Sequence, residues 1–392
     1  MNIYVTGIGV VSATGMNVDE NYHSLKTEKS GIAQTDHLSG KNIFLGVANS
    51  SNEEIIQKNN LKHGPYSRTS LLGYVAAKEA WGGNKDNSEI RTGIISATSV
   101  GGMDKTEQYY SQLLRQPEQD ISLILTHDSG NTTEKIAKEL NISGYINTLS
   151  TACSSGANAI MLAARLIEQN KLDRVLVGGS DALTLFTING FHSLMIFDSQ
   201  FCKPFDENRN GLNLGEGAAY LVLESEKSMK HTSNKPYCLL SGWHNAADAF
   251  HQTASSQEGI GAVIAMQNAL KKAGMTSSDI SYINAHGTGT KNNDLSESHA
   301  IKTVFGQKIP AFSSTKAYTG HTLAAAGAIE AVYSVLALMN DVVFPNLNYE
   351  TPIAETGLVP QVKFKQNAGI KTVLSNSFGF GGNNTSLIFK KL

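Results

Sequence analysis

The chain alternates short apolar segments rich in β-branched residues with longer segments whose apolar positions recur every three to four residues. The short segments predict buried strands, and the longer ones predict helices with one apolar face. Strands are expected at residues 3–5, 92–96, 174–177, 219–224, 282–284 and 372–375. Helices are expected at residues 71–81, 131–140, 156–169, 259–273 and 323–339. Strands that alternate with helices predict an α/β fold in which helices cover buried sheets.

The two halves of the chain repeat the same order of motifs. RTGIISATSVGG in the first half resembles ISYINAHGTGT in the second, and INTLSTACSSGANAIMLAA resembles IPAFSSTKAYTGHTLAAAGAIEAV. RVLVGGSDAL likewise resembles KTVLSNSFGFGGNNTSLIF. Each pair is a strand, a loop of small residues, and then a helix or another strand. The polar segment 227–235 predicts a linker, so we expect an internally duplicated chain with halves at residues 1–230 and 231–392.

Composition and charge narrow the function classes. The 392 residues are 41% hydrophobic and 17% charged, which suits a large core and argues against disorder. A net charge of −2 removes the basic field expected of a nucleic-acid or membrane-surface binder. The N-terminal segment has no basic region and is broken by glycines, so it predicts a strand and turn rather than a signal peptide. No uninterrupted apolar run approaches the ~20 residues of a membrane span, and we expect a soluble cytoplasmic protein.

One of the three cysteines has a sequence context that favours reactivity. The odd number and wide spacing of the cysteines predict neither a disulfide framework nor a thiolate metal cluster. Cys153 lies in STACSSGA, where a predicted helix of small residues begins. The dipole and free N–H groups of a helix N-terminus favour a thiolate and can stabilise an oxyanion. Cys202 and Cys238 lack this context and are interpreted as buried structural residues.

Further candidate residues lie in loops of small residues at predicted strand ends. His286 stands in NAHGTGT, Lys316 and His321 stand in STKAYTGH, and a Gly-rich loop covers residues 377–384. Each has an ordinary structural explanation when taken alone, such as a core histidine, a solvated lysine or a plain hairpin. Two histidines at matching strand ends, with a cysteine at the related third position, favour a shared site instead.

The four motifs TACSSGA, NAHGTGT, STKAYTGH and NSFGFGG together resemble those of the β-ketoacyl-acyl-carrier-protein synthases. The match is to the two-histidine condensing enzymes of the synthase I/II group, in the same order and over essentially the whole chain. The resemblance implies the thiolase fold, an internally duplicated five-layered α/β/α/β/α arrangement. It also implies an acyltransferase that condenses malonyl-acyl carrier protein, with loss of CO2, onto an acyl group held on Cys153. The pathway would be fatty acid, polyene or polyketide chain elongation.

The resemblance also assigns roles to individual residues. The backbone N–H groups of Cys153 and Phe380 would form the oxyanion hole, and His286 and His321 would stabilise the enolate. Lys316 would hold the His321 loop. The remaining implied positions are supporting carboxylates at Glu330 and Asp294, contacts to the phosphopantetheine arm at Thr288 and Thr290, gating aromatics at Phe378 and Phe380, and Val100 at the far end of the acyl tunnel. No metal and no resident cofactor is implied, because the substrates arrive on the phosphopantetheine of acyl carrier protein.

Three departures from a housekeeping synthase narrow the resemblance. Lys291 follows GTGT where a proline is common, the segment between Phe191 and Pro204 is short, and residues 126–137 are atypical. These features resemble ketosynthases of aryl-polyene, flexirubin or dialkylresorcinol pathways. Such enzymes can pair with a partner that lacks the nucleophile, so both a homodimer and a heterodimer are expected alternatives. Lys62 and Arg68 fall where relatives dock the acidic carrier protein.

Other readings of the same residues predict different features. A thiolase would use a second cysteine where this chain has Phe380, and a synthase III-type initiator would carry asparagine at the position of His321. A non-catalytic chain-length factor would lack Cys153. A scaffold that only holds lipid in the tunnel is the alternative outside the enzymes. The primer, the number of extensions and the product stay open at this point.

Overall fold

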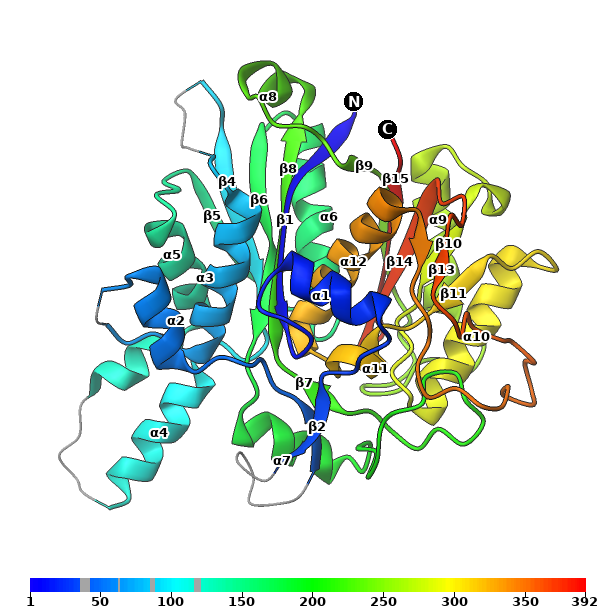
Figure 1. The fold of residues 1–392 in the computed structure, drawn as a ribbon, viewed down its shortest axis with the longest axis horizontal. Coiled ribbons are helices and arrows are strands. Elements are labelled where there is room, and N and C mark those ends of the chain that lie inside the picture. Colours follow the sequence, from blue (N-terminus) through cyan, green and yellow to red (C-terminus); the bar gives the residue numbers. More distant parts are fainter. Residues whose placement is uncertain (36–42, 63, 85–88, 116–120) are drawn as a thin grey trace.

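The core of the fold is a ten-stranded sheet built from two similar five-stranded halves (Figure 1). The computed structural model describes residues 1–35, 43–62, 64–84, 89–115 and 121–392. The strands of the first half, in spatial order, are β5 (Tyr145–Leu149), β4 (Thr92–Ala97), β6 (Arg174–Asp181), β8 (Gly217–Ser225) and β1 (Ile3–Ser12). Those of the second half are β9 (Cys238–Ala247), β15 (Asn383–Lys390), β14 (Thr372–Gly379), β10 (Tyr282–Asn284) and β11 (Ala311–Ser313).

The two halves repeat the same strand order and directions. In the first half β5, β4 and β6 are parallel, and β8 and β1 follow antiparallel. In the second half β11, β10 and β14 are parallel, and β15 and β9 follow antiparallel. The halves join through a short antiparallel pairing of β1 with β9, at Tyr4 with Leu239 and Val5 with Cys238. The internal duplication predicted from the motif order is therefore confirmed.

The major helices form three layers around the two half-sheets. The outer layer of the first half contains α3 (Arg68–Trp81) and α5 (Ser129–Glu139). The outer layer of the second half contains α9 (Ile260–Ala273) and α10 (Lys291–Phe305). Between the half-sheets lie α6 (Ser155–Glu168) and α12 (Ala326–Asn340), which pack on each other and on strands of both halves. This order of layers is the predicted five-layered α/β/α/β/α thiolase fold.

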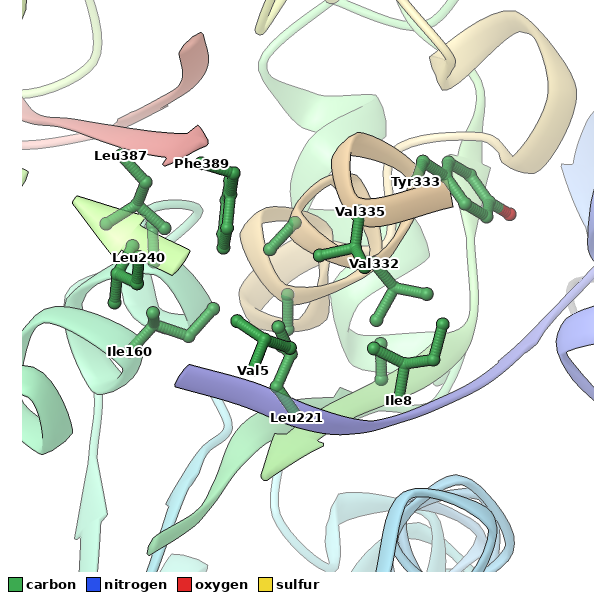
Figure 2. Packing of buried hydrophobic residues seen from close by; sticks show 14 of the residues in the cluster. Val5, Ile8, Ile160, Leu221, Leu240, Val332, Tyr333, Val335, Leu387 and Phe389 are labelled. Carbon is green, nitrogen blue, oxygen red and sulfur yellow. The ribbon is translucent and has the colours of Figure 1, made fainter. Parts of the chain in front are cut away.

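Alternate residues of the central strands face the middle and the outer helices. Val175 and Val177 of β6 join the cluster around α6 and α12, whereas Leu176 joins the cluster around α3. Figure 2 shows Val332 and Val335 of α12 lying between side chains of β1 and β8 and those of β15. Burial on both faces explains why these strands are continuous apolar runs.

The middle helices consist mainly of small and apolar residues because they are enclosed on all sides. Gly156 of α6 and Gly327 of α12 lie where the two helices cross, and an added Cβ at Gly156 would lie 2.7 Å from the backbone nitrogen of Ala328. The stretch Leu323–Asn340 is long and apolar enough to cross a bilayer, but 89% of it is buried inside the fold. It is therefore best understood as a core helix.

The remaining helices, 3₁₀ turns and short strands lie outside these five layers. They are α1 (Val18–Lys26), α2 (Asn52–Asn59), α4 (Met103–Leu113), α7 (Leu185–Ser193), α8 (Glu226–His231) and α11 (Lys316–Thr319), the 3₁₀ turns η1 (Ile121–Thr126), η2 (Ser277–Asp279) and η3 (Leu323–Ala325), and the short strands β2 (Ile32–Thr35), β3 (Ile43–Gly46), β7 (Leu214–Gly215), β12 (Val342–Val343) and β13 (Lys365–Gln366). All the helices and strands expected from the pattern are present, several of them longer than predicted. The predicted linker at residues 227–235 is partly helical, since α8 lies between β8 and β9.

Candidate active site

A cavity of about 430 Å³ lies where loops from both halves meet. The first half contributes Cys153, and the second half contributes His286, His321 and Phe380. Apolar side chains line one part of the wall and polar ones line another. The apolar residues include Phe191, Leu194, Ile196 and Leu212, and the polar ones include Thr288, Thr290, Asn292 and Asn293. The cavity can therefore hold a molecule with an apolar chain and a polar arm.

Cys153 occupies a sharp turn between β5 and α6. Ala152 adopts φ +53°, a left-handed conformation that costs a residue with a Cβ some strain. The turn places Cys153 directly before the N-terminus of α6, with only 6% of the residue exposed. Thr151 N donates to Ser155 Oγ at 2.7 Å, which anchors the turn to the first residue of the helix.

The thiol of Cys153 faces two backbone donors. Burial raises its pKa to about 11, while the charge of Lys316 and the N–H groups of Phe380 and Cys153 act in the opposite direction. Burial therefore acts against the thiolate that a helix N-terminus favours. The same two N–H groups are positioned to receive negative charge that develops beside the sulfur.

His286 follows β10 on a loop that is held by a buried carboxylate. The backbone N–H groups of His286 and Gly287 donate to the two oxygens of Glu297 at 2.9 and 2.8 Å. Lys316 Nζ lies 3.1 Å from Nδ1 of His286 and donates to its carbonyl oxygen at 2.6 Å. Burial, with the charge of Lys316, holds the pKa of His286 well below its usual value, so the ring is neutral. Because an ammonium can only donate, Nδ1 is the acceptor and the proton resides on Nε2.

His321 has the same tautomer for a different reason. The backbone N–H of Leu323 donates to His321 Nδ1 at 3.1 Å, which leaves the proton on Nε2. Leu323 adopts φ +55°, so this turn is also strained. Burial, with the charge of Lys316, holds the pKa of His321 well below its usual value. The centroids of the two imidazoles lie 5.6 Å apart with the rings nearly perpendicular, and both rings line the cavity with Cys153.

Lys316 and Glu330 form a buried ion pair beneath the histidines. Only 2% of the Lys316 side chain is exposed, and its ammonium contacts His286 Nδ1, His286 O and a carboxylate oxygen of Glu330. Three N–H bonds therefore meet three acceptors. Burial raises the pKa of Glu330 to about 7, although the charge of Lys316 opposes this shift.

Asp294 supports the site without lining the cavity. It is completely buried and accepts hydrogen bonds from the backbone N–H groups of Phe205, at 2.7 Å, and Gly289, at 3.2 Å. It thereby holds the loop that carries Thr288 and Thr290, whose hydroxyls lie 2.9 Å apart in the cavity wall. Burial raises the pKa of Asp294.

The two aromatic residues of the Gly-rich loop lie on different sides of the site. The Phe378 ring centroid lies 5.7 Å from that of His286. The Phe380 ring is stacked on that of Phe191 in α7, with the ring centroids 5.8 Å apart and an angle of 17° between the ring planes. Both phenylalanines line the cavity.

Val100 and Arg68 both lie outside the cavity wall. Val100 is buried in a cluster with Leu183, Ile188 and Leu323, behind the cavity rather than in its wall. Arg68 is paired with the buried Glu216 at 2.5 Å, and its guanidinium also donates to backbone carbonyls of Ala48 and Ser50. The guanidinium is therefore engaged within the structure, and its docking role stays a prediction. Lys62 is exposed on the surface.

Sequence reasoning missed several residues that organise the site. Asp181, at the end of β6, is fully buried and accepts hydrogen bonds from Thr98 Oγ1 at 2.6 Å and from the backbone N–H of Ala324 at 2.8 Å. It therefore connects the turn before Val100 to the turn after His321. An acidic residue at the end of a fully buried strand is the local signal that could have identified it.

Comparison with known proteins agrees with this geometry. Residues 1–228 match the family described as beta-ketoacyl synthase, N-terminal domain, and residues 237–350 match beta-ketoacyl synthase, C-terminal domain. A curated relative from Staphylococcus aureus (strain N315), named 3-oxoacyl-[acyl-carrier-protein] synthase 2, is 32% identical over 99% of this chain and 98% of its own length. A protein of the same name from Vibrio cholerae is 32% identical over 100% of this chain and 99% of its own length.

Solved structures with the same fold include ketosynthases in complex with a partner. The ishigamide ketosynthase/chain length factor superposes with a TM-score of 0.92 and 27% identity, covering 100% of this chain and 99% of the other. The ketosynthase ApeO, solved with its chain length factor ApeC from Xenorhabdus doucetiae, has a TM-score of 0.88 and 32% identity, with coverage of 100% and 98%. A further neighbour, with a TM-score of 0.88 and 27% identity over 100% and 99% of the chains, is a type II polyketide ketosynthase with its acyl-carrier protein.

Proposed function

The chain belongs to the β-ketoacyl synthase family, as a condensing 3-oxoacyl-[acyl-carrier-protein] synthase, and we propose that Cys153, His286 and His321 carry out its reaction. The observation that supports this assignment best is the matched tautomer of the two histidines. Both Nδ1 atoms accept a hydrogen bond, so both rings hold their proton on Nε2 in a cavity that also contains the cysteine.

In the first step the sulfur of Cys153 attacks the thioester carbon of an acyl carrier protein. The backbone N–H groups of Cys153 and Phe380 receive the charge that develops on the carbonyl oxygen. The C–S bond to the carrier breaks as the new C–S bond forms. The proton of the neutral Cys153 thiol passes to the departing phosphopantetheine thiolate, so that the step is balanced in charge and atoms.

In the second step malonyl-acyl carrier protein loses CO2. The electron pair of the broken C–C bond moves into the thioester, and the oxygen becomes an enolate. The Nε2–H groups of His286 and His321 donate to that oxygen, and each is most effective when the charge on the oxygen is greatest. The enolate carbon then attacks the acyl carbon on Cys153, and the sulfur of Cys153 leaves as the new C–C bond forms.

The remaining residues act on these groups or on the substrate arm. Lys316 and Glu330 hold the His286 tautomer, and Asp294 holds the loop with Thr288 and Thr290, which would contact the phosphopantetheine. Phe378 and Phe380 would flank the acyl chain. The proposed reaction calls for no metal and no resident cofactor, because the phosphopantetheine of the carrier protein brings both substrates. We place the reaction in the cytoplasm.

We further propose a partner of the same fold, of the chain-length-factor type, which matches the two neighbours solved as ketosynthase–chain length factor complexes. Strand β5 is an edge of the large sheet, and its residues Tyr145 and Ile146 are exposed. Exposed strand edges readily pair with another chain. Helix α4 stands out from the body at the lower left of Figure 1 and has no buried residue. Leu114, which caps the C-terminus of α4, and Ile121 of η1 have exposed apolar side chains that a partner would cover.

Three experiments test these proposals. Intact-protein mass spectrometry, after incubation with a panel of saturated and aryl-polyenoyl carrier-protein thioesters, should show an acyl adduct that is absent from Cys153→Ala. An adduct retained in that variant would exclude Cys153 as the nucleophile. The adducts formed would also show whether the pathway is housekeeping elongation or the aryl-polyene or flexirubin branch that the sequence departures suggest.

The partner is tested by light scattering of the chain alone and mixed with a ketosynthase-like protein that lacks the nucleophile. A one-to-one complex that Ile146→Lys abolishes is expected. If the chain instead forms a stable homodimer that does not bind the added protein, the proposal of a heterodimer is wrong and the partner is a second copy of the chain. Lys62 keeps its proposed docking role and is tested by the Michaelis constant for carrier protein in Lys62→Glu, which should rise because the acidic partner would be repelled.

A further inference from the structure

The two N–H groups that face the Cys153 sulfur belong to different parts of the chain. The N–H of Cys153 lies on the turn before α6, and the N–H of Phe380 lies on the loop between β14 and β15. An oxyanion hole works only if both donors keep a fixed spacing, since hydrogen-bond strength falls steeply with distance and angle. Some contact must therefore hold the turn and the loop together.

Asn383, the first residue of β15, makes that contact. Its side-chain oxygen accepts hydrogen bonds of 2.7 Å from Asn158 Nδ2 and Asn245 Nδ2. It also lies 2.7 Å from Ser154 Oγ, whose single proton is shared between this oxygen and Thr151 O at 2.8 Å. Ser154 is the residue next to Cys153, and Asn158 lies one turn further along α6. Asn383 in turn lies three residues after Phe380, where the loop ends. One amide oxygen thus joins both sides of the oxyanion hole.

The surrounding hydrogen bonds agree with this orientation of the amides. Asn158 Oδ1 accepts from Thr385 Oγ1 at 2.8 Å, and its Nδ2 points toward Asn383. Asn245 Nδ2 also donates to Thr385 Oγ1 at 2.8 Å. With two amide nitrogens directed at it, the Asn383 atom at the centre of the network has to be the oxygen.

Close packing shows that the loop rests directly on the turn. A Cβ added to Gly379 would lie 2.9 Å from Thr151 O and 3.1 Å from Ser154 N. Such an approach is open only to glycine, and it leaves the loop no room to move toward the turn. Asn383 prevents the opposite movement, in which the loop would separate from the turn.

We propose that Asn383 is a positioning residue that sets the spacing of the Cys153 and Phe380 N–H groups. The inference rests on the proposed function, since it requires those groups to act on an acyl thioester. It predicts that loss of the Asn383 oxygen slows acyl transfer and condensation but not the decarboxylation of malonyl-acyl carrier protein. Decarboxylation depends on His286 and His321, which Asn383 does not contact.

The test compares Asn383→Leu with Asn383→Asp. Leucine has a similar size and no acceptor, whereas aspartate keeps an oxygen for the same three donors. Removal of a complete oxyanion donor costs about 10²–10³ in rate, and displaced donors should cost less, so Asn383→Leu should slow acyl transfer at least about tenfold. Asn383→Asp should recover most of that rate. Malonyl decarboxylation should change by less than about twofold in both variants, and Asn340→Leu, at the exposed end of α12, serves as the control of equal size.

The outcomes are distinguishable from failure of the proposed function. Wild type that neither acylates nor decarboxylates would remove the proposed function itself. If the wild type is active but Asn383→Leu lowers acyl transfer and decarboxylation equally, or lowers neither, only the role of Asn383 would be overturned. If circular dichroism shows that Asn383→Leu does not fold, Ser154→Ala replaces it, because this small change removes one of the three donors. An unchanged ratio of the two rates in Ser154→Ala would then overturn the inference.

Discussion

Replacing Lys316 with methionine should separate the two half-reactions. Methionine retains much of the length and bulk of the lysine side chain but removes the ammonium, which contacts His286 Nδ1, His286 O and Glu330. Without a donor at Nδ1, His286 is free to carry its proton there. The Nε2 atom would then have no proton to give to an enolate oxygen, although the ring would remain in place.

The size of the effect follows from the loss of one donor. Removal of a single hydrogen-bond donor from a developing oxyanion costs about 10²–10³ in rate, or about 2.7–4 kcal/mol. Malonyl decarboxylation should fall by this factor. Acyl transfer to Cys153 should fall by less than about tenfold, since it uses the backbone N–H groups of Cys153 and Phe380.

Stability should change as well, because Glu330 loses its partner. Breaking a buried ion pair from one side costs about 3–5 kcal/mol. Burial already raises the pKa of Glu330 to about 7, so proton uptake by the orphaned carboxylate should keep the cost near the lower end of that range. The double variant Lys316→Met/Glu330→Gln should therefore regain stability without regaining decarboxylation.

The assay measures both half-reactions on the same preparations, as CO2 release from malonyl-acyl carrier protein and as the mass of acylated Cys153. Arg68→Met is the matched control, since Arg68 forms an ion pair with the buried Glu216 away from the cavity. It should cost comparable stability and leave the ratio of the two rates unchanged. If Lys316→Met lowers both rates by the same factor, as Arg68→Met would, the tautomer argument is wrong.

Three further variants probe the cavity wall, the loop and the ionisation of the site. Val100→Phe adds bulk to the cluster behind the cavity and should shorten the longest acyl chain found on Cys153 by mass spectrometry; an unchanged chain-length profile would contradict the tunnel reading. Gly379→Ala should displace the loop from Thr151 O and reduce acyl transfer more than decarboxylation, which the same two assays would detect. The pKa of Glu330 is raised to about 7 from its usual 4.5, so the folded state binds this proton more tightly than the unfolded state does. The resulting stabilisation is fully present at low pH and is lost as the pH rises through 7. Urea unfolding at pH 5 and pH 8 should therefore show that the stability of wild type relative to Glu330→Gln falls by up to about 3 kcal/mol with rising pH, and an equal difference at both pH values would refute the assigned shift.

The parts of the fold that were predictable are those encoded by local pattern. Strands such as β4 and β6 are apolar on both faces because helices cover both, and this yields continuous β-branched runs that are easy to recognise. The motif order revealed the duplication, because each motif follows the same kind of strand end in both halves. Helices α4 and α7 were not predicted, and neither belongs to the core: α4 has no buried residue, and α7 buries only Ile188.

The parts that were not predictable depend on partners distant in sequence. From the sequence alone, Arg68 is a cation that could dock an acidic protein. In the fold its guanidinium pairs with Glu216, which lies 148 residues away in the sequence. The state of the Cys153 thiol depends on its burial among elements of both halves, which the local motif does not report. Asn383 is one of two asparagines in the Gly-rich loop at residues 377–384, and only its contacts with Ser154, Asn158 and Asn245 distinguish it.

The duplicated architecture explains why the chemistry is divided as it is. In both halves a strained turn precedes a middle helix: Ala152, with φ +53°, stands before α6, and Leu323, with φ +55°, stands before α12. In the first half this turn presents the sulfur of Cys153 at a helix N-terminus. In the second half the corresponding turn directs the Leu323 N–H onto His321 Nδ1. The strained turn therefore keeps the His321 proton on Nε2, from which it can be donated. Because α6 and α12 pack directly on each other, the two turns open into one cavity, and the same local geometry supplies the nucleophile from one half and the enolate-stabilising donor from the other.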